Sequence, residues 1–173
     1  IAQKFNNDFG VEEFLKVPEP LIQKEFSRIM SLKDGSKKMS KSELSDLSRI
    51  NLTDDKDQII NKIKKAKTDP LPMPKNVKEL EKRPEAQNLL GIYTNLNSST
   101  LETSIAKFAG KNFSEFKDEL SETLVDKIMP ISEEIKKLLK DQSYLDSILL
   151  NGVENANKTA SKKIKNIKEI VGF

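Results

Sequence analysis

Apolar residues recur every three or four positions over the last third of the chain, and this spacing limits the fold more than any other feature of the sequence. A first series consists of Phe113, Phe116, Leu120, Leu124, Ile128, Ile131, Ile135 and Leu138. A second series consists of Leu145, Ile148 or Leu149, Val153, Ala156, Ala160, Ile164, Ile167 and Ile170. Each series predicts a long helix whose apolar face packs in a core.

Proline and glycine mark special points of these two helices. Pro130 lies inside the first helix, where its ring opposes the carbonyl of Asp126, so we expect a kink there. Gly172 follows the second series and is expected to end that helix.

Shorter helices are predicted before them. Thr53 and the two aspartates after it supply a cap and acids for the first turn of one helix. Three prolines then break the chain in a linker over residues 69–76. Pro84 opens the next helix, and a short helix from about Leu101 is ended by a glycine. The fold class is therefore mainly α, with a helical bundle over residues 53–173.

Residues 1–52 have a different character. A short opening helix is expected to end near Gly10, and a loop-like stretch with two prolines covers residues 11–25. Residues 26–32 alternate loosely between apolar and polar side chains, which predicts the end of a buried strand. Residues 33–42 have no apolar period and many turn-forming residues, which predicts a mobile surface loop.

Composition excludes several kinds of chemistry. The 173 residues include no Cys, His or Trp, so disulfides, imidazole bases and Cys/His zinc sites are excluded within them. The net charge of +3 gives no global nucleic-acid signature. The longest apolar run is the three residues 148–150, which excludes a transmembrane helix. The sequence starts at Ile1, inside an uncapped helix, and we expect it to be a fragment of a longer protein.

The loop segment Lys38-Met39-Ser40-Lys41-Ser42 carries the clearest chemical signal. It places two ammonium groups and two hydroxyls on one flexible segment, a donor set that suits phosphate oxygens. When an α-phosphate is attacked in line, negative charge develops on the leaving pyrophosphate, and a lysine approaching that charge lowers the barrier. The plain alternative is a solvated turn rich in Lys and Ser.

The same segment is the second signature of class I aminoacyl-tRNA synthetases. Together with its flanks, Arg28-Ile29-Met30-Ser31-Leu32 and Lys37, it resembles the tryptophanyl-tRNA synthetases. Thr68-Asp69-Pro70 and the run Arg83-Pro84-Glu85-Ala86-Gln87-Asn88-Leu89-Leu90-Gly91-Ile92-Tyr93 are similar to the helical domain of that family. Asn151-Gly152-Val153-Glu154-Asn155-Ala156-Asn157-Lys158 resembles its closing helix. The resemblance spans essentially the whole chain but only the C-terminal half of the family's enzyme.

The resemblance implies roles for residues of this loop. Lys41 would be the main contact to pyrophosphate, with Lys38 as its helper, and both are the candidate catalytic residues. Ser40 and Ser42 would hold phosphates or the loop itself, while Met39 and the backbone of Ile29 would lie against the adenine of ATP. Magnesium would arrive bound to ATP, and no protein-bound metal is predicted.

The resemblance also implies an organisation and partners. Residues 1–52 would be the C-terminal end of a Rossmann-like nucleotide-binding domain, and residues 53–173 a helical anticodon-binding domain. The parent enzyme would join tryptophan to its tRNA with ATP, as a cytoplasmic homodimer without a membrane. Tryptophan would bind through the N-terminal half, so the isolated chain is expected to be inactive.

Two departures from the family pattern and three alternatives accompany this interpretation. The family's first signature contains histidine, which is absent here, and Glu43-Leu44 stand where Asp-Pro is common. The chain could instead be a non-enzymatic tRNA-binding module, half of a tyrosyl-tRNA synthetase, or a purely structural bundle. The run 83–93 favours the tryptophan enzyme over the tyrosine enzyme.

Two groups of lysines could contact a tRNA backbone or could simply form the solvent-exposed faces of helices. They are Lys56, Lys62, Lys64, Lys65 and Lys67, and Lys158, Lys162, Lys163, Lys165 and Lys168. The acids of residues 115–134 lie between apolar positions and are read as a solvated helix face. The sequence does not indicate which side chains would read an anticodon.

Overall fold

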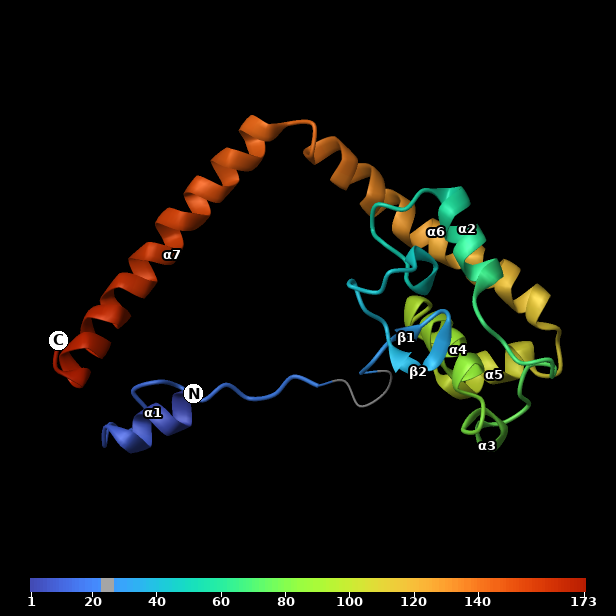
Figure 1. Ribbon diagram of the computed structural model, residues 1–173, viewed down its shortest axis with the longest axis horizontal. Coiled ribbons are helices and arrows are strands. Elements are labelled where there is room, and N and C mark those ends of the chain that lie inside the picture. The colour runs from blue at the N-terminus through green and yellow to red at the C-terminus, as the bar shows by residue number, and fades with distance from the viewer. Residues whose placement is uncertain (23–26) are drawn as a thin grey trace. The chain divides into compact units, whose positions relative to one another are not determined.

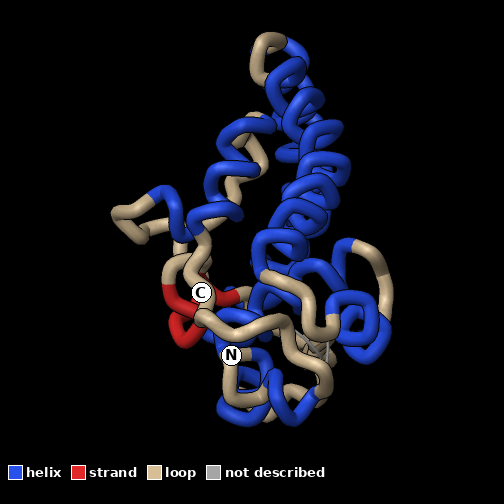
Figure 2. The backbone as a smooth tube through the Cα atoms, turned by 90° about the vertical axis from the view of Figure 1, so that its right-hand side faces the viewer, coloured by secondary structure: helices blue, strands red, loops and turns tan. Residues whose placement is uncertain are grey.

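The computed structural model describes residues 1–22 and 27–173. Helices dominate these residues, and strands form only a small two-stranded sheet (Figures 1 and 2), so the predicted mainly α class is confirmed. The helices are α1 Ala2–Asp8, α2 Lys56–Lys65, α3 Val77–Leu80, α4 Pro84–Leu96, α5 Leu101–Phe108, α6 Phe113–Leu138 and α7 Gln142–Val171. The strands are β1 Met30–Ser31 and β2 Asp34–Lys38, and a 3₁₀ helix covers Asp46–Ser48.

Packing divides the chain into two compact units. One consists of residues 1–22 and 138–173, and the other of residues 23–137. The first holds α1 and α7; there the Lys163 ammonium lies 3.7 Å from the ring centre of Phe14 and donates to the Phe14 carbonyl. The second holds the sheet and helices α2 to α6.

Local signals set the helix ends of the second unit, with one correction: the cap expected at Thr53 lies two residues later, because the capping box with Gln58 belongs to Asp55. Asp55 caps α2: its carboxylate accepts from the Gln58 amide at 2.8 Å, and the Gln58 side chain accepts from the Asp55 amide at 2.8 Å. Pro84 is the first residue of α4. Gly110, just past α5, has φ +73° in the left-handed region.

The core of this unit is made by one face each of α2, α4, α5 and α6. Phe108 and Phe116 pack edge to face with ring centres 4.8 Å apart, and Tyr93 stands edge-on to Phe108 at 4.9 Å. Leu32, between β1 and β2, is only 2% exposed and joins this core. The hairpin is therefore part of the packed unit.

A forked ion pair fixes the linker over residues 69–76. The Arg83 guanidinium donates to both carboxylate oxygens of Asp69, at 2.8 and 2.6 Å, and to the Pro72 carbonyl at 2.7 Å. Burial raises the pKa of Asp69, but the hydrogen bonds from Arg83 and from the Leu71 amide, together with the charge of Arg83, outweigh it, and the pKa lies below its usual value. The segments 68–70 and 83–93, which both carry the family resemblance, are thus in direct contact.

The β1–β2 hairpin differs from what the sequence predicts for residues 26–42. Residues 34–38, expected to belong to a mobile loop, form β2 and pair with β1. The strand expected over residues 26–32 is limited to Met30–Ser31, and the expectations for residues 23–26 lie outside the described residues. The polar side chains of β2 give no strand signal, and contacts distant in sequence support its pairing.

The two long helices are less buried than the sequence predicts. The α6 series is buried from Phe116 to Ile128, but Phe113 is only half-buried and Ile131 is 47% exposed. No residue of α7 is buried, although Gly172 ends it as predicted with φ +89°. Among residues 1–22 and 27–173, the apolar face of α7 is covered only near its two ends, where Leu145, Ile167 and Ile170 are half-buried. Helix α6 runs on through Pro130, and the expected kink stays a prediction.

Hydropathy gives one further result. In the part of the chain that the structure describes, every helix is too short or too polar to cross a membrane.

Candidate active site

The β1–β2 hairpin carries the Lys38–Ser42 segment. Met30 stands opposite Lys38 in the antiparallel pair, and Ser31 stands opposite Asp34. One step beyond the sheet, the Met39 amide donates to the Ile29 carbonyl at 3.0 Å. The Asp34 carboxylate accepts from the hydroxyl and the amide of Ser36, which lowers the pKa of Asp34. The lysine segment therefore begins from a defined strand end.

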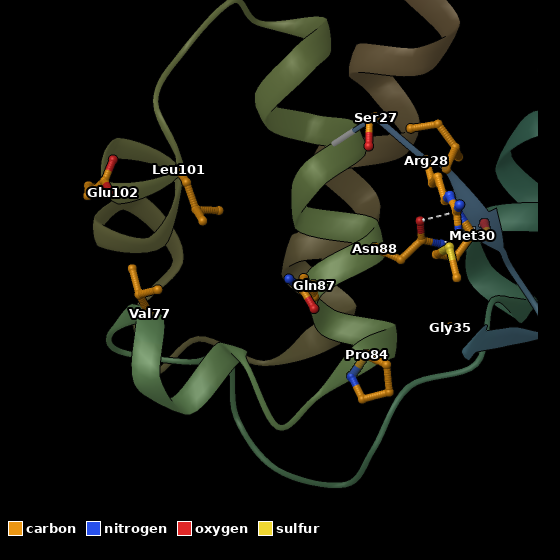
Figure 3. Close-up of a pocket in the computed structure, with 11 residues that line it drawn as sticks. Ser27, Arg28, Met30, Gly35, Val77, Pro84, Gln87, Asn88, Leu101 and Glu102 are labelled. Atoms are coloured by element: carbon orange, nitrogen blue, oxygen red, sulfur yellow. Dashed lines mark hydrogen bonds between the residues drawn. The ribbon is translucent and has the colours of Figure 1, made fainter. Parts of the chain in front are cut away.

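Helix α4 holds this hairpin with a side-chain amide. Asn88 accepts from the Met30 amide at 2.9 Å and donates to the Met30 carbonyl at 2.8 Å. Figure 3 shows the Asn88 side chain pointing from α4 toward Met30. Asn88 is only 8% exposed, so both hydrogen bonds are shielded from water. The strand beside Ile29 is thus fixed to a helix 58 residues away in sequence.

Gly35 makes the second contact between the hairpin and α4. A Cβ atom on Gly35 would lie 2.6 Å from the backbone nitrogen of Glu85 and 2.7 Å from the Pro84 carbonyl oxygen. Only glycine permits this approach, because the neighbouring atoms belong to the backbone and cannot rotate away.

Gly35→Ala should therefore push the hairpin off α4 and lower the free energy of unfolding by about 1–3 kcal/mol. Chemical denaturation followed by circular dichroism would measure it. Gly152→Ala is the matched control, because nothing lies within 4 Å of its Cβ position on exposed α7. That change should not destabilise the chain, since alanine favours helix. Equal stability of Gly35→Ala and wild type would contradict the tight contact.

The lysine segment itself combines exposed cations with an anchored methionine. Lys38 and Lys41 are exposed, and neither has an ion-pair partner among the described residues. Met39 is half-buried against the core. The Ser40 and Ser42 hydroxyls are 2.9 Å apart and hydrogen-bonded, and the Ser42 amide donates to the Ser40 hydroxyl at 3.3 Å. Both serines therefore shape the turn that presents Lys41.

An ion cluster around the buried Lys62 holds the segment that follows the loop. The Lys62 ammonium lies 2.6 Å from a carboxylate oxygen of Asp46 and 2.6 Å from one of Asp54. The Asn51 side chain donates to the same two aspartates, at 2.9 and 3.2 Å. Hydrogen bonds from Lys62 and Asn51 hold the pKa of Asp46 below its usual value.

Arg49 extends this cluster toward the loop. Its guanidinium lies 3.2 Å from a carboxylate oxygen of Asp46 and donates to the Glu43 carbonyl at 3.0 Å. Glu43 directly follows the Lys38–Ser42 segment. A continuous set of polar contacts therefore joins Lys62 in α2 to the backbone at the downstream end of the loop.

Three of the six predicted site residues line two hollows, and Met39, Lys41 and Ser42 line neither. Ile29 lines a cavity of about 560 Å³ beside α4, with Met30, Gln87 and Asn88 (Figure 3). Lys38 and Ser40 line a separate hollow of about 250 Å³. The structure brings Ile29 and Met39 together through their backbone hydrogen bond, but it does not gather all six predicted residues around one cavity.

The sequence interpretation missed the residues that support the loop. Asn88 is a polar residue among buried positions of α4, and Lys62 stands on the buried face of α2 with Ile59 and Ile63. The sequence does contain a signal for Lys62, because it occupies a position of the helical period that otherwise carries apolar residues. Lys62 is therefore not on a wet face, which corrects its place among the candidate tRNA contacts. Lys67 is paired as well, 2.8 Å from Glu85.

Comparison with known proteins identifies the family. The family model described as tRNA synthetases class I (W and Y) matches residues 1–129. A protein named tryptophan–tRNA ligase from Caulobacter vibrioides is 49% identical over 173 residues, covering 100% of this chain and 50% of the relative. One from Mesorhizobium japonicum is 46% identical and covers 100% of this chain and 54% of the relative.

A solved structure agrees with these relatives. The tryptophanyl-tRNA synthetase of Mycoplasma pneumoniae matches with a TM-score of 0.79 at 26% identity, over 99% of this chain and 52% of that one. The chain spans about half the length of the relatives it matches. The chain therefore belongs to the class I tRNA synthetases of the tryptophan and tyrosine group, and it corresponds to the C-terminal half of those named tryptophan–tRNA ligase.

Proposed function

We propose that the full-length enzyme containing this chain activates tryptophan with ATP and transfers it to the terminal ribose of its tRNA. The observation that carries the proposal is the exposed pair Lys38 and Lys41, presented by a hairpin fixed to α4, in a chain 49% identical to a tryptophan–tRNA ligase. A solvated Lys/Ser turn would need no such anchoring.

In the first step a carboxylate oxygen of tryptophan attacks the α-phosphorus of ATP. The bond from that phosphorus to the bridging oxygen of pyrophosphate breaks, which gives tryptophanyl adenylate and pyrophosphate. Lys41, helped by Lys38, stabilises the charge that develops on the leaving group. In the second step a ribose hydroxyl of the tRNA attacks the acyl carbon, and AMP leaves.

The other predicted residues position ATP. Met39 and the backbone of Ile29 lie against the adenine, and their mutual hydrogen bond fixes that edge. Ser40 and Ser42 hold the turn, as their own hydrogen bond supports, and offer hydroxyls to phosphate oxygens. Magnesium enters bound to the phosphates of ATP, because this segment supplies cations and hydroxyls rather than carboxylates.

We further propose the division of the enzyme and its partners. Residues 1–52 finish the nucleotide-binding domain, and residues 53–173 form the domain that receives the anticodon. The exposed lysines Lys56, Lys64 and Lys65 of α2 are candidates for contacts to tRNA phosphates. The full-length enzyme would act as a cytoplasmic homodimer.

The test is tryptophan-dependent exchange between ATP and radioactive pyrophosphate. The full-length enzyme should catalyse it, and the 173-residue chain alone should not, because one lysine segment cannot position two substrates. Exchange that requires tyrosine instead of tryptophan would favour a tyrosyl-tRNA synthetase. Binding of tRNA with no exchange by the full-length protein would favour a non-enzymatic module.

A further inference from the structure

Lys62 is a buried cation whose position the proposed reaction does not by itself explain. Its side chain is 3% exposed and lies on the apolar face of α2 beside Ile59 and Ile63. Buried lysines are rare unless they are paired, and Lys62 has two carboxylates, Asp46 and Asp54, each at 2.6 Å. Lys62 supplies one of the two positive charges that these carboxylates need, and Arg49, 3.2 Å from Asp46, supplies the other.

The two aspartates belong to different parts of the chain. Asp54 is buried immediately before the capping residue of α2, so it is fixed to the same helix as Lys62. Asp46 begins the 3₁₀ helix that follows the lysine segment. Lys62 therefore ties the downstream stem of the loop, residues 43–51, to the start of α2.

The contacts of Arg49 carry this restraint to the loop. Arg49 bridges the Asp46 carboxylate and the Glu43 carbonyl, and its guanidinium also donates to Asn51 at 3.1 Å. The upstream end is held separately by Asn88 and by the contact of Gly35 with α4. The four residues between the two anchors are Met39, Ser40, Lys41 and Ser42.

We propose that Lys62 is a positioning residue that holds the downstream end of the loop and so places Lys41. It touches no substrate and acts through Asp46 and Arg49. Without its charge only Asn51 and Arg49 would oppose the repulsion between the Asp46 and Asp54 carboxylates, and the stem would separate from α2 more often. This inference rests on the proposed function only for its kinetic consequence, since holding the loop is a property of the protein alone.

Limited digestion of the full-length enzyme with trypsin tests the restraint directly. In Lys62→Met, cleavage after Lys41 should become roughly tenfold faster, because the loop opens more often. Cleavage after Lys140, exposed in the turn between α6 and α7, should keep its rate and serves as an internal control for general unfolding. Mass spectrometry distinguishes the two products.

Lys117→Met is the matched control variant. Lys117 is also buried, and its ammonium donates to the Lys64 and Ala66 carbonyls at the other end of α2, at 3.1 and 2.6 Å. If Lys62 only stabilised α2, both variants would speed cleavage after Lys41 equally. We expect the effect in Lys62→Met alone. Equal effects in both variants, no effect in Lys62→Met, or an equal rise after Lys140 would overturn the proposal.

Asp46→Asn keeps the test available if Lys62→Met does not fold. The Asp46 side chain is 54% exposed, so the substitution leaves the core intact, and it removes the charge that Lys62 holds. Cleavage after Lys41 should again rise, by a smaller factor, because an amide oxygen still accepts from Lys62. An unchanged rate in this variant would contradict the proposed restraint.

Kinetics then separate this inference from the proposed function. In Lys62→Met the kcat of pyrophosphate exchange should fall about tenfold with an unchanged KM for tryptophan, because a displaced loop misplaces Lys41 without touching the tryptophan site. An enzyme without exchange would refute the proposed function, and the digestion would still decide the role of Lys62. Normal kcat in Lys62→Met would refute the positioning role.

Discussion

Lys41→Ala in the full-length enzyme should lower the rate of tryptophan-dependent pyrophosphate exchange by about 10²–10³-fold. The reason is that Lys41 is proposed to stabilise the transition state more than bound ATP, because the negative charge it contacts develops only as pyrophosphate leaves. Exposure of the side chain agrees with this, because no protein carboxylate among the described residues competes for its ammonium group. The KM for tryptophan should change little.

The control for this experiment is a lysine of equal charge outside the proposed site. Lys82 is exposed between α3 and α4 and has no assigned role, so Lys82→Ala should exchange pyrophosphate like the wild type. Lys38→Ala should lose less than Lys41→Ala, because it is proposed as the helper. If Lys41→Ala kept its full rate, the segment would be an ordinary solvated turn.

Phe116→Ala should lower the free energy of unfolding by about 3–5 kcal/mol. Phe116 is 0% exposed, and its ring packs against Phe108 at 4.8 Å and against Tyr93 at 6.2 Å between ring centres. Removing it leaves a cavity where α4, α5 and α6 meet. Those helices include α4, which holds the hairpin, so we also expect faster trypsin cleavage in the lysine segment.

Chemical denaturation followed by circular dichroism measures this loss of stability. Phe173→Ala removes the same side chain from a position that is 92% exposed and should stay within about 0.5 kcal/mol of the wild type. A loss below about 1 kcal/mol for Phe116→Ala would mean that the aromatic cluster collapses around the gap or is not close-packed.

The sequence predicted those parts of the fold that depend on neighbouring residues. The proline at the start of α4 and the left-handed glycine after α5 act within one turn, so their residue types are sufficient signals. The cap of α2 was expected at Thr53 and lies at Asp55, because three neighbouring residues can all cap a helix. The class of the fold followed from the same signals. Helix α7 has no buried residue. Its helical spacing defines an apolar face without defining what covers that face.

The candidate site was predictable only in part, for a related reason. Lys38 and Lys41 were found because they are neighbours in one motif, and the structure confirms their exposure. Strand β2 was missed because its polar sequence has no strand signal, and its support comes from far along the chain: Gly35 lies against Pro84, and Asn88 holds the partner strand β1. Lys62 was expected either to contact tRNA or to lie on a solvated face, because charge suggested water, whereas its position on the buried face of α2 decides its surroundings.

The amide of Asn88 has an evolutionary consequence. Both of its hydrogen bonds reach the main chain of Met30, and neither involves the Met30 side chain. The contact is therefore indifferent to which amino acid, other than proline, occupies position 30. In descendants of this gene, only the pocket that the side chain lines restricts which residue occupies position 30. Replacement of Asn88, in contrast, leaves the main-chain amide and carbonyl of residue 30 without these partners, whichever side chain residue 30 carries.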